Sequence, residues 1–428
     1  MVGVGWLVVM DDWLGRGGPL GAVLGFAIGG ALLLPIGYVY GQLVMSMPDA
    51  AGEIAYTAKV FSQKTSFVTG WMMVLAYFIV CPWEAVATGR IAGYIFPELN
   101  HFELYRVAGK PVYLPHLVVG LGLTVFLTIL NYRGIRLSAT FQNWTAFGTL
   151  ALFVVFVSFG AAHGSASNFP PLFSGSSVLV SIFLVMQIVP YFMTGYESVA
   201  KAAEEASPEF RSRGFFTAII MAIVVGILFY TIVIAAVAYA APWKSLLNTP
   251  LMTAVAFEQA VGSRWIVNVI LSSALLSLFK VFNGNFVAAS RLVFALGRRE
   301  MISTRYSRIH PIYRTPSTAI VAVGVGTGLG MLLGQALLVP VSEVGSVASA
   351  SGWTAACAAY YAMKPDRGRQ IVALLGACIG LLLVLMKVIP ALPGHFSQYE
   401  WLALGIWLVV GVLLHWRAKP QRTSKTGP

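Results

Sequence analysis

The chain contains the stretch Pro190-Tyr191-Phe192-Met193-Thr194-Gly195-Tyr196-Glu197-Ser198, and this stretch decides how the rest is interpreted. It follows the apolar run 178–189 and precedes the charged segment 201–213, so hydropathy alone assigns it to one membrane crossing. Proline removes a helix hydrogen bond, and glycine permits backbone angles that end a helix. Unpaired backbone groups persist at membrane depth only where protein or a wet cavity covers them. The stretch therefore predicts a broken helix, and the acidic Glu197 within it predicts a functional site.

The composition of the whole chain is typical of a membrane protein. Of 428 residues, 58% are hydrophobic and 10% are charged, whereas a soluble domain carries about 25% charged residues. No polar stretch is long enough to fold separately, so we expect one polytopic, all-α membrane domain over residues 1–428. Twelve crossings, the first incomplete, are predicted at 1–14, 19–46, 66–96, 114–131, 140–162, 178–204, 214–241, 264–297, 316–336, 340–363, 370–390 and 399–416.

Loop charges predict the orientation. Most of the 28 basic residues fall in the even-numbered loops and at the C-terminus, which places these segments, including the tail 417–428, in the cytoplasm. The same bias explains the net charge of +12 without any nucleic acid. We therefore expect the cytoplasmic membrane as the location, with lipid and a small molecule as partners; the oligomeric state stays open.

The chain begins with a short apolar run that contains Gly3-Val4-Gly5 and Trp6. The apolar run there ends after ten residues at Asp11 and Asp12, which we expect to be exposed on the outer face. Because so short a run cannot span a membrane, we expect the native chain to begin upstream, with about 15–30 further residues that complete the first helix.

Four motifs in order resemble the amino acid–polyamine–organocation (APC) transporter superfamily. Gly3-Val4-Gly5 with Gly18-Pro19 resembles its broken first helix and the start of the second, and residues 47–56 resemble the loop after helix 2. Residues 194–197 with 203–205 resemble its helix 6 signature, and residues 289–291 with 309–316 resemble the end of helix 8 and the loop beyond. The resemblance implies an APC-type fold with broken helices 1 and 6, and binding of a substrate carboxylate at Gly3–Gly5 and of its amino group at Thr194–Glu197.

The spacing of the two breaks supports the same arrangement. They lie five crossings apart, as expected for two five-helix inverted repeats (1–162 and 178–363) followed by two accessory helices (370–416). The start of a half-helix attracts an anion and its end attracts a cation, so together they suit a zwitterion. The candidate substrate-binding residues are Gly3, Val4, Gly5, Trp6, Glu84, Tyr191, Thr194, Gly195, Tyr196 and Glu197.

Charged residues inside the predicted crossings are few. Glu84 and Lys280 lie deep within helices 3 and 8, whereas Arg90, Glu343 and Lys387 lie closer to the ends of their crossings. A buried ammonium loses its proton more easily, so Lys280 is a candidate for proton coupling, with Glu84 as a second coupling residue. The alternative is a structural ion pair between Glu84 and Lys280.

We therefore predict a secondary active transporter for an amino acid, either proton-coupled or exchanging, which works by alternating access. The alternatives are a carrier of polyamines or other organic amines and, in another class, a truncated non-transporting protein or sensor. An enzyme is not expected, because the six histidines and three cysteines show no metal or redox spacing. No metal or cofactor is expected, and the expected coupling ion is the proton.

Overall fold

A computed structural model describes residues 3–134, 139–175, 177–199 and 212–418. Its first half consists of the helices α1 (Gly5–Val8), α2 (Met10–Ala31), α3 (Leu33–Ser46), α4 (Glu53–Val60), α5 (Gln63–Phe78), α6 (Val80–Ile95), α7 (Leu114–Tyr132), α8 (Ala139–His163), α9 (Val178–Met186) and α10 (Val189–Met193). Its second half consists of α12 (Ser212–Ala240), α13 (Trp243–Leu246), α14 (Met252–Val261), α15 (Arg264–Arg298), α16 (Ser317–Gly330), α17 (Leu338–Ala362), α18 (Arg367–Val388) and α19 (Gln398–Arg417). Short 3-10 helices occur at Pro97–Asn100, Ala166–Asn168, Thr304–Ser307 and Met331–Leu337.

The described residues include nine helical segments that are long and apolar enough to cross a membrane: Met10–Ser46, Gln63–Ile95, Leu114–Tyr132, Trp144–His163, Gly214–Ala240, Arg264–Arg298, Ser317–Ala362, Arg367–Val388 and Gln398–Arg417. These segments cover ten of the twelve predicted crossings, because Ser317–Ala362 contains two of them. The other two are the broken first and sixth helices. The predicted all-α membrane class is therefore confirmed.

The structure corrects some predicted boundaries. The crossing predicted at 316–336 ends as an α-helix at Gly330, and the 3-10 helix after it bends at Gly334. The last residues of the crossing predicted at 178–204 lie outside the described residues, as do Glu204, Glu205 and most of the tail 417–428. Two short antiparallel strands, β1 (Glu103–Val107) and β2 (Lys110–Tyr113), form a hairpin between α6 and α7 that the sequence did not predict. The division into two inverted repeats stays a prediction.

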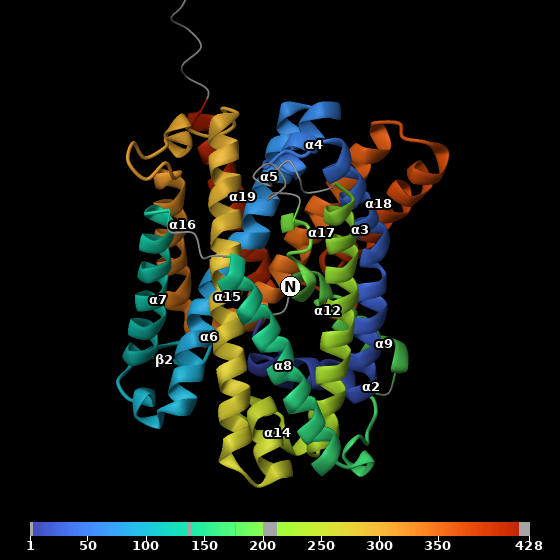
Figure 1. Ribbon diagram of the computed structural model, residues 1–428, viewed down its shortest axis with the longest axis vertical. Coiled ribbons are helices and arrows are strands. Elements are labelled where there is room, and N and C mark those ends of the chain that lie inside the picture. Colours follow the sequence, from blue (N-terminus) through green and yellow to red (C-terminus); the bar gives the residue numbers. More distant parts are fainter. Residues whose placement is uncertain (1–2, 135–138, 176, 200–211, 419–428) are drawn as a thin grey trace, which may run out of the picture.

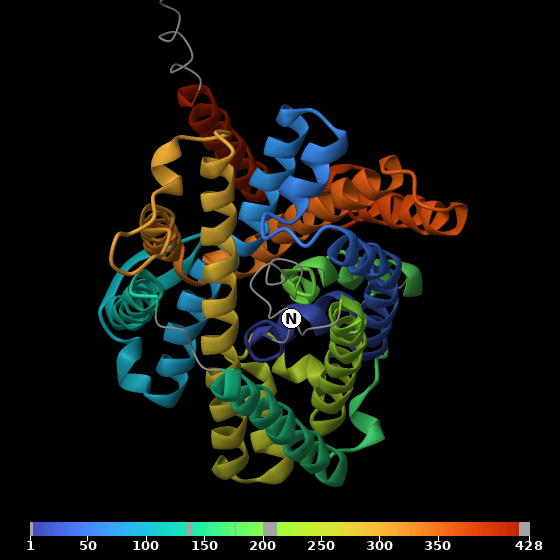
Figure 2. The ribbon, with the colours of Figure 1, turned by 45° about the horizontal axis from the view of Figure 1, so that its top comes forward.

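The helices form one bundle with the broken segments inside it. Figures 1 and 2 show the long helix α15 running the length of the molecule, with α7 and α16 on one side and α2, α3 and α12 on the other. In both views the beginning of the chain lies near the middle of the bundle, beside α12. The helix α2 packs against α9 and α12, and α17 packs against α18 and α5.

Local sequence accounts for the bends in these helices. At Gly18 the backbone takes φ 63° and ψ 177°, so α2 consists of a half-helix followed by a long helix that starts at Pro19. The resemblance implied that the second helix starts at Gly18-Pro19, and the structure shows this start. Pro190 sits in the first turn of α10, where its missing N–H has no helical partner to lose. Ser397 and Glu400 form a reciprocal capping box that starts α19.

Candidate functional site

The two predicted breaks border one cavity. Its volume is about 30 Å³. Six predicted site residues line it: Gly3, Val4, Gly5, Glu84, Tyr191 and Thr194. The structure thus brings together residues that lie about 190 positions apart in the sequence.

The first break brings backbone close to the other elements of the site. Val4 has φ −100° and ψ 9°, and α1 begins directly after it at Gly5. A Cβ atom on Gly5 would lie 2.4 Å from Cε1 of Phe192, so only glycine permits this approach of the first half-helix to α10. A Cβ atom on Gly3 would lie 3.3 Å from Oε1 of Glu84.

The second break occurs at the end of α10. Thr194 leaves the helical region with ψ 143°, and Gly195 has φ 122°, a value that side chains disfavour. The hydroxyl of Thr194 donates to the carbonyl of Pro190 at 2.6 Å and contacts the hydroxyl of Ser349 at 2.6 Å. Because the single hydroxyl proton of Thr194 is donated to Pro190, the hydroxyl of Ser349 must be the donor in its contact with Thr194. This end of α10 is therefore fixed to α17.

Glu84 gives the cavity its acidic group. The residue lies on α6 and is 2% exposed, and its Oε2 atom has no hydrogen-bond partner in the described part of the chain. The hydroxyl of Tyr191 likewise has no partner among the described residues. Because a buried polar atom without a partner is costly, these two atoms are free to bond to water or to a ligand in the cavity.

Four predicted site residues lie outside the cavity lining. The ring of Trp6 packs 5.6 Å from that of Phe156, and the ring of Tyr196 packs 5.4 Å from that of Trp353. Glu197 accepts a hydrogen bond from the hydroxyl of Tyr77 at 3.0 Å and one from the amide of Gly195 at 3.0 Å. Tyr196, Gly195 and Glu197 therefore shape the turn after α10. Their direct contact with substrate stays a prediction.

Lys280 lies on α15 next to the cavity but does not line it. The neighbouring Val281 and Asn285 line the cavity instead. Lys280 forms no ion pair with Glu84, so the structural pair considered as an alternative is not found between these two described residues. Coupling by Lys280 stays a prediction.

The sequence analysis missed half of the cavity lining: Val80, Trp83, Phe192, Tyr230, Val281 and Asn285. Asn285 carries a usable signal, since a polar residue deep in an apolar crossing is a candidate for function. Trp83 and Phe192 adjoin predicted site residues in sequence. Val80, Tyr230 and Val281 carry no such signal, because their exposure to the cavity depends on how each helix is rotated. Asp12 is also corrected: it is only partly exposed and forms an ion pair with Arg16 at 2.8 Å.

Comparison with known proteins decides the family. The family model described as amino acid permease matches residues 1–413, nearly the whole chain. The chain belongs to the amino acid permease family of the APC superfamily. It is therefore a multi-pass membrane transporter and not an enzyme.

Relatives of this permease carry several substrate names. It is 23% identical to the methylthioribose transporter of Bacillus subtilis (strain 168), over 97% of this chain and 89% of that one. It is 22% identical to a branched-chain amino acid permease of the same organism, with the same two shares. It is 26% identical to a gamma-aminobutyric acid permease of that organism, over 75% of this chain and 67% of the relative.

Proposed function

We propose that this permease moves a small α-amino acid across the cytoplasmic membrane by alternating access. The observation that carries the proposal is the meeting of both helix breaks at a cavity that also holds the unpartnered Oε2 of Glu84. Gly3 to Gly5 offer backbone amides at the start of a half-helix, which suit a carboxylate. Glu84 and the carbonyls at the end of α10 suit an ammonium group. Together they suit a zwitterion.

The size of the cavity supports a cycle of opening and closing. The cavity is small, at about 30 Å³, so we expect the helices around it to separate when a substrate binds. Thr194 and Tyr191 are bonded to Ser349 and Ser346 on α17, so a shift of α10 must alter contacts on α17 as well. Entry of substrate therefore requires movement of the broken helices against their neighbours, as alternating access demands.

Orientation and coupling form part of the proposal. The loops rich in lysine and arginine would face the cytoplasm together with the C-terminus, by the positive-inside rule. The proton is the proposed coupling ion, with Lys280 and Glu84 as its candidate carriers. Either symport with protons or exchange of substrates would fit this arrangement.

A carrier of organic amines is the second candidate. It is favoured by Glu84, since an ammonium group alone would satisfy this carboxylate, while Val4, Val80 and Val281 supply an apolar surface for the rest of an amine. The names of the relatives do not choose between the two, because they include a sugar derivative and several amino acids.

Ligand-induced stabilisation of the purified permease separates these candidates. The common amino acids are screened first by thermal unfolding in detergent. The best one is then compared with the amine that lacks its carboxylate and the acid that lacks its amino group. A ligand at 100 times its Kd stabilises by about 2.7 kcal/mol, so binding is readily detected. The proposal predicts stabilisation by the amino acid alone; stabilisation by the amine as well selects the second candidate, and stabilisation by the acid alone refutes both.

A further inference from the structure

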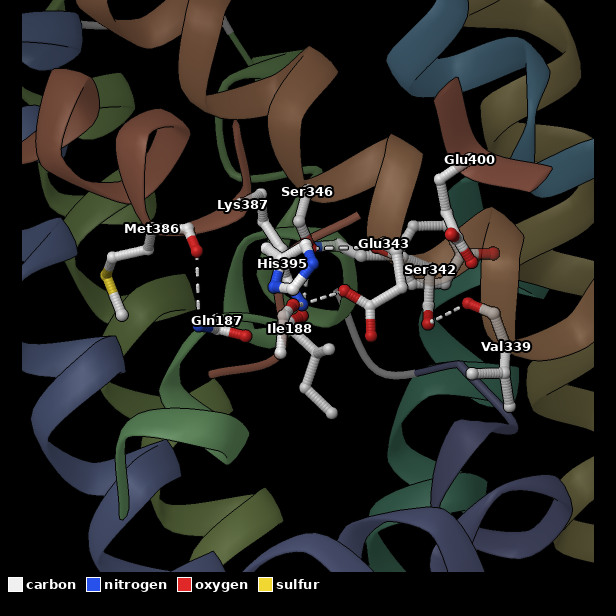
Figure 3. Close-up of polar contacts among 12 residues, drawn as sticks. Gln187, Ile188, Val339, Ser342, Glu343, Ser346, Met386, Lys387, His395 and Glu400 are labelled. Atoms are coloured by element: carbon white, nitrogen blue, oxygen red, sulfur yellow. Dashed lines mark hydrogen bonds and ion pairs between the residues drawn. The ribbon is translucent and has the colours of Figure 1, made fainter. Parts of the chain in front are cut away.

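Four charged side chains form an ion network away from the cavity. Asp12 and Arg16 lie on the half-helix at the start of α2, Glu343 lies on α17, and Lys387 lies on α18. Nε of Arg16 is 2.8 Å from Oδ2 of Asp12, and Nη1 of Arg16 is 2.6 Å from Oε1 of Glu343. Nζ of Lys387 pairs with Oε2 of Glu343, and Figure 3 shows these two side chains pointing toward one another. We call these four residues the ion network.

The ion network is balanced in charge, and its members Glu343 and Lys387 are buried. The side chain of Lys387 is 0% exposed and that of Glu343 is 8% exposed. A buried charge without a partner is strongly destabilising, and two acidic groups with two basic groups avoid that cost. Nζ of Lys387 also donates to the carbonyl of Gly394 at 2.9 Å, which fixes it to the segment after α18.

The network divides into two neutral halves along the boundary between helices. Asp12 and Arg16 share one half-helix, four residues apart, and Glu343 and Lys387 join α17 to α18. The contact between Arg16 and Glu343 is the one that crosses from the first pair to the second. If the ion pair between Arg16 and Glu343 breaks, Arg16 stays paired with Asp12, and Glu343 stays paired with Lys387. Breaking this ion pair therefore leaves no buried charge without a counter-ion.

The same side of α17 contacts residues that line the cavity. Ser346 and Ser349 follow Glu343 at intervals of three residues and so lie on one side of the helix. The hydroxyl of Ser346 accepts from the amide of Tyr191 at 3.1 Å, and the hydroxyl of Ser349 contacts that of Thr194 at 2.6 Å. Residues that line the cavity are thus bonded to the helix that carries Glu343.

We propose that Lys387 is a positioning residue that holds Glu343 in place. Arg16 closes the cavity to the outer face when it pairs with Glu343, and the cavity opens to that face when this ion pair breaks. The outer face is the one reached by the segment 389–397 in the proposed orientation, and the inference rests on the proposed transport cycle. The neutrality of each half lowers the free energy needed to open. Removal of Lys387 makes Arg16 the sole partner of a buried carboxylate and makes opening harder.

Opposite effects of two substitutions test the proposal. A cysteine is introduced at Val80, which lines the cavity, in a background where Cys81, Cys357 and Cys378 are alanine. A membrane-impermeant thiol reagent is applied from the outer face of proteoliposomes, and from the inner face as a control. Arg16→Gln is expected to raise the outer labelling rate about tenfold and Lys387→Met to lower it by a similar factor, each equivalent to about 1.4 kcal/mol. Lys387→Arg keeps the charge and is expected to label at the rate of the parent.

Other outcomes overturn the proposal. If the ion network only braces the fold, both substitutions lower the unfolding temperature without a change of labelling that depends on the face. Equal labelling of parent and Arg16→Gln, or faster labelling of Lys387→Met, contradicts the positioning role. If Lys387→Met does not fold, a double variant with Glu343→Gln and Lys387→Met is used, which removes one charge of each sign. The proposal predicts that this double variant is labelled as fast as Arg16→Gln. A labelling rate equal to that of the parent overturns the proposal. Labelling needs no substrate, so its failure leaves the proposed function untouched.

Discussion

The carboxylate of Glu84 lies against the backbone of Gly3, where a Cβ atom would come within 3.3 Å of Oε1. This contact joins α6 to the first break, and α10 completes the enclosure from the other side. The cavity therefore has a carboxylate beside the start of one half-helix and the end of another. It offers groups that attract a cation and groups that attract an anion. The expected effects of substitutions follow from this arrangement.

Gly5→Ala is expected to weaken substrate binding about tenfold, or by about 1.4 kcal/mol. The new methyl group would lie 2.4 Å from Cε1 of Phe192, so the first half-helix and α10 must move apart where they border the cavity. Gly15→Ala is the matched control, since the nearest atom to its Cβ is a leucine methyl at 3.8 Å. Titration of the purified variants by calorimetry measures both affinities. Equal losses in the two variants would show that the close approach at Gly5 has no special role in binding.

Glu84→Gln is expected to weaken binding at least about tenfold, because a hydrogen bond to a charged group contributes about 1.5–3 kcal/mol. The amide keeps the shape of the side chain but cannot carry the negative charge that faces the ammonium group. Glu98→Gln, on an exposed 3-10 helix, is the control. Binding by the Glu84 variant at parental affinity would remove this residue from the site.

Lys280→Met is expected to abolish accumulation of substrate driven by a pH gradient while exchange of substrate across the membrane persists. The reason is that the cavity lining stays intact, since Val281 and Asn285 and not Lys280 border it. Paired assays in the same proteoliposomes, with and without a pH gradient, measure the two activities. Lys244→Met, near the end of the short helix α13, is the control for loss of a positive charge. Unchanged accumulation would end the coupling role, and loss of both activities would assign Lys280 to the fold.

Trp407→Phe is expected to lower the free energy of unfolding by about 1 kcal/mol. The indole N–H of Trp407 donates to the carbonyl of Trp71 at 3.2 Å, and that of Trp71 donates to the carbonyl of Trp407 at 2.9 Å, which fixes α19 to α5. Phenylalanine keeps the ring stack but loses one donor. Trp401→Phe, on the same helix and 42% exposed, is expected to change little. Thermal unfolding in detergent compares Trp407→Phe with Trp401→Phe. An equal loss of stability in the two variants would show that the reciprocal hydrogen bonds between Trp71 and Trp407 add no stability.

The sequence predicted features that depend on local chemistry. Pro190 and Gly195 predicted a broken helix because each residue limits the helix by itself. The start of the second helix at Gly18-Pro19 came from the family resemblance. Glu84 was predicted as a site residue because a carboxylate deep in an apolar crossing needs a function or a partner. These predictions required no knowledge of which helices are neighbours.

Features that depend on helix rotation and contact could not be predicted. Glu343 and Lys387 each lie near the end of a predicted crossing, and the sequence did not predict that they pair inside the bundle. Their pairing depends on how α17 packs against α18. Likewise, Val281 lines the cavity and its neighbour Lys280 does not, since one residue along a helix turns the side chain by about 100°. The sequence placed Lys280 deep within its crossing without showing where the side chain points.

The most direct test of the central claim is counterflow in proteoliposomes. Vesicles loaded with each common amino acid in turn are diluted into the same amino acid carrying a radioactive label, and entry of the label is followed. The account predicts saturable entry of at least one amino acid into vesicles with the parent protein or Gly15→Ala, and strongly reduced entry with Gly5→Ala. No entry of any amino acid through correctly folded parent protein, or equal entry with Gly5→Ala, would contradict an amino acid site between the two helix breaks.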